Sequence, residues 1–368
     1  MYTSLLLTVN ALLFITQSCS FTFTLQHYSK HVMKSKPLDA TSGSDDIYYT
    51  KARVNYSAVN EYIHAHYNVS QYFHHNECIE TIHDGRRTQE ECCNEREMLR
   101  ENGLAIVASP MPINQIDWSS RDSVQQHYLP ELERIVHKLF PEKIMYLSFW
   151  NPMMRGESLE ISQERNQFDS PTANIASLVH IDTDVGAYES IEELLVIIDN
   201  NQMHYESIIS SSSILEGVAD DITKRQKRFA IINFWKNIGE VPVTRAPLSI
   251  YSPRYDGNVA FPDATPNVGK SKWYMFPYVT KDEVIVFYQY DRERNQPSDL
   301  WHCAIEVKEK AMDSVHRRTS FDIRAFIVFD EEVSANNDRF SLERTRPILS
   351  FEESGCFCDE QAAKMPPK

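Results

Sequence analysis

The chain has 368 residues, of which 42% are hydrophobic and 24% are charged, and this composition excludes disorder over the whole length. Its formal net charge of −15 disfavours nucleic acid as a partner, because an acidic surface repels phosphate groups. The 7 cysteines are too few for a disulfide framework in a chain of this length. The body of the chain has no apolar run of about 18 residues, so we expect no stable membrane span in the mature protein.

The first 20 residues are typical of a secretory signal peptide. The run from Leu5 to Ile15 is mostly apolar, and the small or polar residues Ser18, Cys19 and Ser20 follow it. Residues 21–45 form a transit-like segment or a disordered linker, and they are poor in acids as far as residue 40. This order is similar to the bipartite plastid presequence of algae with secondary plastids. We expect entry into the secretory pathway, followed by plastid import, secretion or retention in the endoplasmic reticulum.

Residues 46–140 are predicted to form a mainly helical part that packs on the rest of the protein. A charged stretch of good helix formers covers 86–102, and Gly103 is a typical stop signal. Apolar residues recur at helical spacing over 123–139, and Pro141 follows them. Pro130 lies inside that second span, where it either divides the helix or marks its start.

From residue 144 the pattern changes to short apolar or alternating runs separated by turn residues. Such regular spacing predicts a mainly β fold, a sandwich or a jelly roll, over a core of residues 141–331. Residues 207–228 are expected to include a short helix or an insertion, and residues 332–368 a peripheral tail. The predicted strands cover residues 144–150, 175–181, 194–198, 228–235, 248–251, 272–276, 283–290, 302–307 and 320–329.

His180 and Asp182 end one predicted strand and could bind a metal ion together. Residues two apart in a strand point to the same face, so an imidazole and a carboxylate could share one ion. A distant second histidine would complete a 2-His-1-carboxylate set for Fe(II), and His302 at the start of a late strand is the best candidate. His75 and His204 also precede an acid by two positions, but we expect them on a solvated face and in a loop.

Arg318, Ser320 and Arg324 have even spacing and can share one face of the last strand. A guanidinium and a hydroxyl together make a suitable fork for a carboxylate, because arginine binds carboxylates with two parallel hydrogen bonds.

This combination resembles the Fe(II)/2-oxoglutarate-dependent dioxygenases, in the branch that contains the cephem-methoxylase small subunit and the gibberellin-desaturase-like hydroxylases of fungal metabolism. The matching segments keep their order and spacing over about residues 144–331. Two positions depart from the family pattern, since Lys236 stands where arginine is frequent and Cys303 where threonine is frequent. The matching segments are 180–182, 228–236, 242–243, 246–248, 272–274, 282–284, 291, 302 and 318–324.

The resemblance implies a double-stranded β-helix with flanking α-helices. It implies that His180, Asp182 and His302 hold Fe(II), and that Arg318 with Ser320 binds the distal carboxylate of 2-oxoglutarate, with Arg324 as the competing residue. The cofactors would be Fe(II), 2-oxoglutarate as co-substrate and O2, with ascorbate as the reductant in assays. Asn233 and Trp235 would lie near the pocket.

The resemblance also implies a small-molecule substrate, oxidised at an unactivated C–H bond by hydroxylation, desaturation or oxidative cyclisation. With an algal presequence, one candidate reaction is the closure of a prenylated amino acid to a kainoid such as domoic acid. An acidic substrate would need a basic residue such as Arg155, Arg245 or Arg254. Two alternatives stay open: a metal-dependent cupin enzyme without 2-oxoglutarate, and a secreted non-catalytic jelly-roll binding protein. The oligomeric state leaves no signal in this sequence.

Overall fold

The computed structural model of the chain describes residues 49–55, 77–156, 173–183, 185, 188, 190–203, 214–252, 272–293, 300–307 and 317–338. All of them lie in one compact unit that runs from Ile47 to Lys368. The predicted signal peptide, the transit-like segment, His75, His204, Arg254 and most of the predicted tail lie outside the described residues. No helix in the described part is long and apolar enough to cross a membrane.

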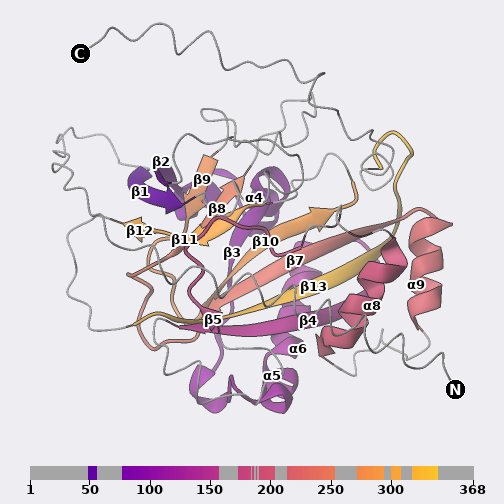
Figure 1. Cartoon of the computed structure of the whole chain (residues 1–368), viewed down its shortest axis with the longest axis horizontal. Helices are drawn as coiled ribbons and strands as arrows, with labels where there is room; N and C mark the ends of the chain where they lie inside the picture. Colours follow the sequence, from indigo (N-terminus) through magenta and orange to yellow (C-terminus); the bar gives the residue numbers. More distant parts are fainter. Residues whose placement is uncertain are drawn as a thin grey trace, which may run out of the picture. The chain divides into compact units, whose positions relative to one another are not determined.

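Two mostly antiparallel sheets form the core of the described chain (Figure 1). The larger sheet has the order β3 (Leu104–Ala108), β10 (Glu283–Asp291), β7 (Lys227–Asn237), β13 (Thr319–Glu332), β4 (Ile144–Gly156) and β5 (Ala173–Asn174), and β6 (Gln202–Met203) also pairs with β4. The smaller sheet has the order β11 (His302–Ala304), β8 (Leu248–Ser252), β9 (Lys272–Met275), β2 (Glu77–Asp84), β1 (Tyr49–Asn55) and β12 (Glu306–Val307). This arrangement confirms the predicted mainly β, jelly-roll class with flanking helices.

The N-terminal helical region differs from the prediction in how it is divided. The span 86–102 forms two helices, α3 (Gly85–Glu91) and α4 (Glu95–Asn102), because the Asn94 side chain caps the second one by accepting from the Glu97 N–H at 2.9 Å. Gly103 ends α4 with a positive φ of 77°, as expected of a helix stop. The span 123–139 forms α5 (Arg121–His127) and α6 (Leu129–Leu139), and Pro130 lies in the first turn of α6.

Three further elements depart from the predicted pattern. The run 194–198 is not a strand but part of α8 (Ile191–Asn201), whose buried residues Ile191, Leu194, Leu195 and Ile198 follow helical spacing. The predicted strand over 175–181 contains only isolated bridges. Strands β1, β2 and β3 lie in the region predicted as helix and loop. The short helix expected within 207–228 is α9 (Ile214–Thr223), and η2 (Ile113–Gln115) is a single 3-10 turn.

The two faces of β13 carry different side chains, and this difference positions the site. One face is apolar along its length and packs with α6 in the main core, through Phe321, Ile323, Ala325, Ile327 and Phe329. The other face packs with α8 and α9 at one end, through Phe326 and Val328. Toward the other end the same face becomes polar, with Ser320, Asp322 and Arg324, all buried. A polar patch is therefore enclosed between the two sheets.

Candidate metal centre

Backbone pairing brings His180 and His302 together at the edge of the smaller sheet. The His180 N–H donates to the His302 carbonyl at 3.1 Å, and the His302 N–H donates back to the His180 carbonyl at 2.9 Å. Residues that pair in this way have side chains on the same face, and the two imidazole centroids lie 4.3 Å apart. Two histidines from distant parts of the chain therefore present their rings side by side.

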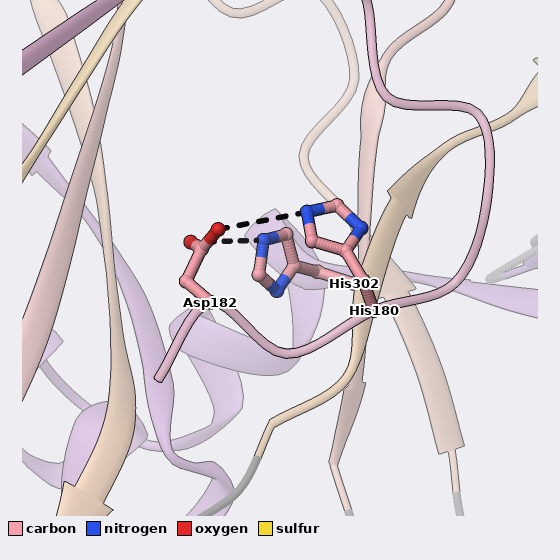
Figure 2. A group of neighbouring side chains, drawn as sticks. All are labelled: His180, Asp182 and His302. Carbon is pink, nitrogen blue, oxygen red and sulfur yellow. Dashed lines mark ion pairs between the residues drawn. The ribbon is translucent and has the colours of Figure 1, made fainter. Parts of the chain in front are cut away.

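Asp182 completes the group of three residues that the sequence predicts as metal ligands. Its Oδ1 lies 3.6 Å from His180 Nε2, and its Oδ2 lies 3.3 Å from His302 Nε2 (Figure 2). One ligand atom from each residue falls within 4.8 Å of the other two. Two imidazole nitrogens and one carboxylate at this spacing form a donor set that suits a divalent transition metal.

Both histidines are oriented by hydrogen bonds from their second ring nitrogen. His180 Nδ1 lies 2.8 Å from the Leu178 carbonyl, and His302 Nδ1 lies 3.2 Å from the Leu300 carbonyl. Because a carbonyl only accepts, each Nδ1 carries a proton, and Nε2 is the ring atom that faces Asp182. This is the tautomer that metal-binding histidines need.

The larger sheet holds the Asp182 carboxylate in place. Arg324 Nη2 on β13 lies 2.9 Å from Oδ1, and Asn233 Nδ2 on β7 donates to Oδ2 at 2.9 Å. The Asp182 backbone N–H donates to Gln289 Oε1 on β10 at 3.0 Å. Three neighbouring strands thus fix the carboxylate, while backbone pairing at the edge of the smaller sheet fixes the two histidines. The sequence did not predict Gln289 as a site residue, because it lies within an apolar strand and nothing in that pattern indicates a polar partner.

The electrostatics favour the protonation states that bind a metal. Burial, reinforced by the neighbouring His302, lowers the pKa of His180 to about 4, so its imidazole is neutral at pH 7. Burial, the largest single influence, would raise the pKa of Asp182, but the Arg324 guanidinium together with His302 and His180 outweighs it, and the pKa lies well below its usual range. A neutral imidazole and an ionised carboxylate are therefore present before any ion arrives.

A small pocket lies beside the two histidines. Its lining includes His180, His302, Trp235 and Arg318. Arg318 Nη1 donates to the Ala246 carbonyl and Nη2 to Ser320 Oγ at 3.3 Å, and its guanidinium carbon lies 4.8 Å from the centroid of the Trp235 ring. This guanidinium is held rigidly at the cavity wall, as a carboxylate-binding group should be.

The geometry separates the two arginines that sequence spacing left as competitors. Arg324 is bound to the Asp182 carboxylate, whereas Arg318 lines the cavity next to the Ser320 hydroxyl. The two side chains therefore lie in different places: Arg324 contacts the Asp182 carboxylate, and Arg318 lies at the wall of the cavity.

Buried polar atoms at the cavity fit a polar ligand. Trp235 and Asn233 both line the cavity. The indole N–H of Trp235 and the Oδ1 atom of Asn233 have no hydrogen-bond partner among the described residues. Leaving such groups without a partner costs free energy, so a ligand or water is expected to satisfy them. Together with the donor set of His180, Asp182 and His302, these atoms fit a divalent ion with a polar co-substrate beside it.

A family model described as "YDMC: Oxidoreductase/YMDC permease-like domain" matches residues 47–329. The description names an oxidoreductase and confirms the predicted enzyme class. Among solved structures, the iron and alpha-ketoglutarate-dependent endoperoxidase NvfI is similar at 17% identity, covering 78% of this chain and 100% of that one, with a TM-score of 0.50. A point variant of NvfI gives a TM-score of 0.52, also at 17% identity, with 78% and 99% covered. At this identity the likeness shows the fold. The comparison with curated protein sequences found no match.

Proposed function

We propose that this chain, which belongs to the family described as "YDMC: Oxidoreductase/YMDC permease-like domain", is an Fe(II)/2-oxoglutarate-dependent oxygenase that oxidises a small molecule. One observation carries the proposal: His180, Asp182 and His302 place two imidazoles and one carboxylate within 4.8 Å of one another. A facial set of this composition leaves positions open on the ion for a co-substrate and O2.

Each residue has a defined task in this proposal. His180 and His302 would hold the ion through Nε2, because their Nδ1 atoms are committed to backbone carbonyls. Asp182 would supply the negative ligand, kept ionised and oriented by Arg324. When bound, Fe(II) with 2-oxoglutarate and O2 supplies the oxidising chemistry that removes hydrogen from an unactivated C–H bond.

Arg318 would bind the distal carboxylate of 2-oxoglutarate, with the Ser320 hydroxyl beside it. Support comes from the fixed orientation of this guanidinium at the cavity wall. Trp235 stacks on the same group and would shield the ion pair from water, which strengthens it. A cupin-type enzyme without a keto acid would need neither Arg318 nor Ser320, and a non-catalytic binding protein would not need the metal ligands.

We further propose that the product arises by hydroxylation, desaturation or oxidative cyclisation of a specialised metabolite, with a prenylated amino acid closing to a kainoid as one specific candidate. Product mass separates these outcomes. Hydroxylation adds one oxygen, whereas desaturation and ring closure both remove two hydrogens and are then distinguished by proton NMR.

The decisive experiment follows the co-substrate. Anaerobic titration of the Fe(II)-loaded protein with 2-oxoglutarate should produce a visible charge-transfer band, and air with ascorbate should then yield succinate. His180→Ala should lose both signals, because two ligands no longer hold the ion. If the wild-type protein binds Fe(II) but gives neither the band nor succinate, the proposal is wrong and the cupin alternative gains support.

The destination of the protein is a separate proposal that rests on residues 1–45 alone. We propose that they direct it into the secretory pathway, with plastid import, secretion or retention in the endoplasmic reticulum as the onward step. Fusion of residues 1–45 to a fluorescent protein in an alga with secondary plastids tests this, and fluorescence that stays in the cytosol contradicts it.

A further inference from the structure

Arg155 reaches the cavity because β4 contains a bulge. Asn151, with a φ of 52°, and Pro152 lie between the register pairs Trp150–Arg324 and Met153–Asp322. Between these two pairs β4 advances by three residues while β13 advances by two, so β4 contains one extra residue. The side chains of β4 therefore exchange faces at this point.

The packing of β4 shows this exchange of faces. Trp150, before the bulge, packs with α8 and α9 on the inner face of the sheet, whereas Met154, after it, packs in the core on the outer face. In a regular strand, residue 154 would share the face of Trp150 and Arg155 would point away from the cavity. The bulge instead aligns Arg155 with Ser320 and turns its guanidinium inward.

Arg155 forms an ion pair with Asp322 inside the cavity. Arg155 Nε lies 3.1 Å from Asp322 Oδ1 and 3.3 Å from Oδ2, and the two side chains are 14% and 8% exposed. Both residues line the cavity, and Arg155 contributes to the electrostatics of His180 and Asp182. A second charged pair therefore lies close to the candidate metal ligands.

The charges around the described part of the cavity do not cancel. Arg155, Arg318 and Arg324 provide three positive groups, and Asp182 and Asp322 provide two negative ones. A divalent ion and the two carboxylates of 2-oxoglutarate would neutralise each other, so the described groups around the loaded site keep one positive charge. Burial also raises the pKa of Asp322, although Arg155 opposes this shift. The raised pKa reduces the negative charge that Asp322 contributes.

We infer that Arg155, oriented by Asp322, binds a carboxylate group of the substrate and so selects substrates that carry one. This inference rests on the proposed function and names the substrate class of the same site. Arg318 is assigned to the keto acid and Arg324 to Asp182, which leaves Arg155 as the cavity arginine for the substrate. Of the other arginines considered from the sequence, Arg245 is exposed and Arg254 lies outside the described residues.

Hexanoate and its neutral isostere hexanamide test this inference on the full chain loaded with Zn(II) and saturating 2-oxoglutarate. Saturation-transfer NMR follows the probe and the keto acid at the same time. Hexanoate should bind roughly 10- to 100-fold more tightly than hexanamide, because a charge-assisted hydrogen bond is lost with the amide. Arg155→Gln should remove this preference, and Arg155→Lys should retain part of it.

The controls separate binding from folding. Arg100→Gln removes an exposed arginine on α4 and should behave as wild type, and thermal unfolding checks that each variant is folded. The inference is overturned if hexanoate and hexanamide bind equally or not at all, if the preference persists in Arg155→Gln, or if hexanoate displaces the keto acid. Equal weakening of hexanoate and 2-oxoglutarate by Arg155→Gln would assign Arg155 to the keto acid instead. If wild type fails to bind 2-oxoglutarate, the proposed function itself fails.

Discussion

Replacing Arg318 by glutamine should weaken the binding of 2-oxoglutarate while the metal site stays intact. The side chain touches the Ser320 hydroxyl, the Ala246 carbonyl and the Trp235 ring, but none of the three metal ligands. Glutamine retains a polar end and loses the positive charge and the planar fork. The variant therefore isolates the interaction with the distal carboxylate.

The size of the effect follows from the groups involved. A charge-assisted hydrogen bond contributes about 1.5–3 kcal/mol, and the burial of Arg318, which is 6% exposed, places this interaction at the upper end of the range. A loss of about 3 kcal/mol corresponds to a Kd that rises roughly 150-fold. Ser320→Ala removes one neutral hydrogen bond and should raise the Kd only about fivefold.

Anaerobic titration of the Fe(II) proteins with 2-oxoglutarate, read from the visible charge-transfer band, measures these constants. Cobalt(II) titration in the absence of the keto acid provides the control, since the metal affinity of Arg318→Gln should equal that of wild type. A Kd for 2-oxoglutarate within threefold of wild type would refute the assignment of Arg318.

Three further predictions address the surroundings of the site. Asn233→Ala removes the hydrogen bond to Asp182 Oδ2 and should lower the affinity for cobalt(II) about 10- to 100-fold; an unchanged titration curve would contradict the orienting role. The pKa of His180 falls from 6.5 to about 4 on folding, so the metal-free protein should lose up to about 3 kcal/mol of stability as the pH falls from 6.5 to 4. Urea unfolding at both pH values should show a smaller loss in His180→Phe. Burial lowers the pKa of Lys236 from 10.5 to about 8, so wild type should gain about 3 kcal/mol relative to Lys236→Met between pH 8 and 10.5; parallel stability curves would show that the amine is not buried as described.

The sequence predicted the central strands better than the outer ones for a physical reason. β7, β10 and β13 are buried on both faces, so their apolar runs are long and easily recognised. β2 is more polar, so its own residues give a weak strand pattern. One of its two neighbours, β9, lies far away in the sequence, so this pairing could not be predicted from local residues. The run 194–198 has a strand-like composition, yet Ile191 and Leu194 extend a helical spacing that decides the outcome.

The candidate site divides in the same way. His180 and Asp182 are two residues apart, so their local spacing was enough to predict them as a pair. His302 could be predicted because it begins a second strand later in the chain. The partners of Asp182 could not be found by spacing, because Asn233, Gln289 and Arg324 approach it across the gap between two sheets. The position of Arg155 at the cavity results from a bulge in β4. The dipeptide Asn151–Pro152 alone is not enough to predict that bulge from the sequence.

The reciprocal backbone bonds between His180 and His302 have a consequence for how the protein matures. Ribosomal synthesis delivers His180 long before His302, and the bridge between them cannot form until the later segment has joined the smaller sheet. A nascent or truncated chain offers at most a histidine and an aspartate, too few donors to capture an ion firmly. A metal ion at this site would therefore be bound firmly only after the fold has closed, which makes metal loading a late step in biogenesis.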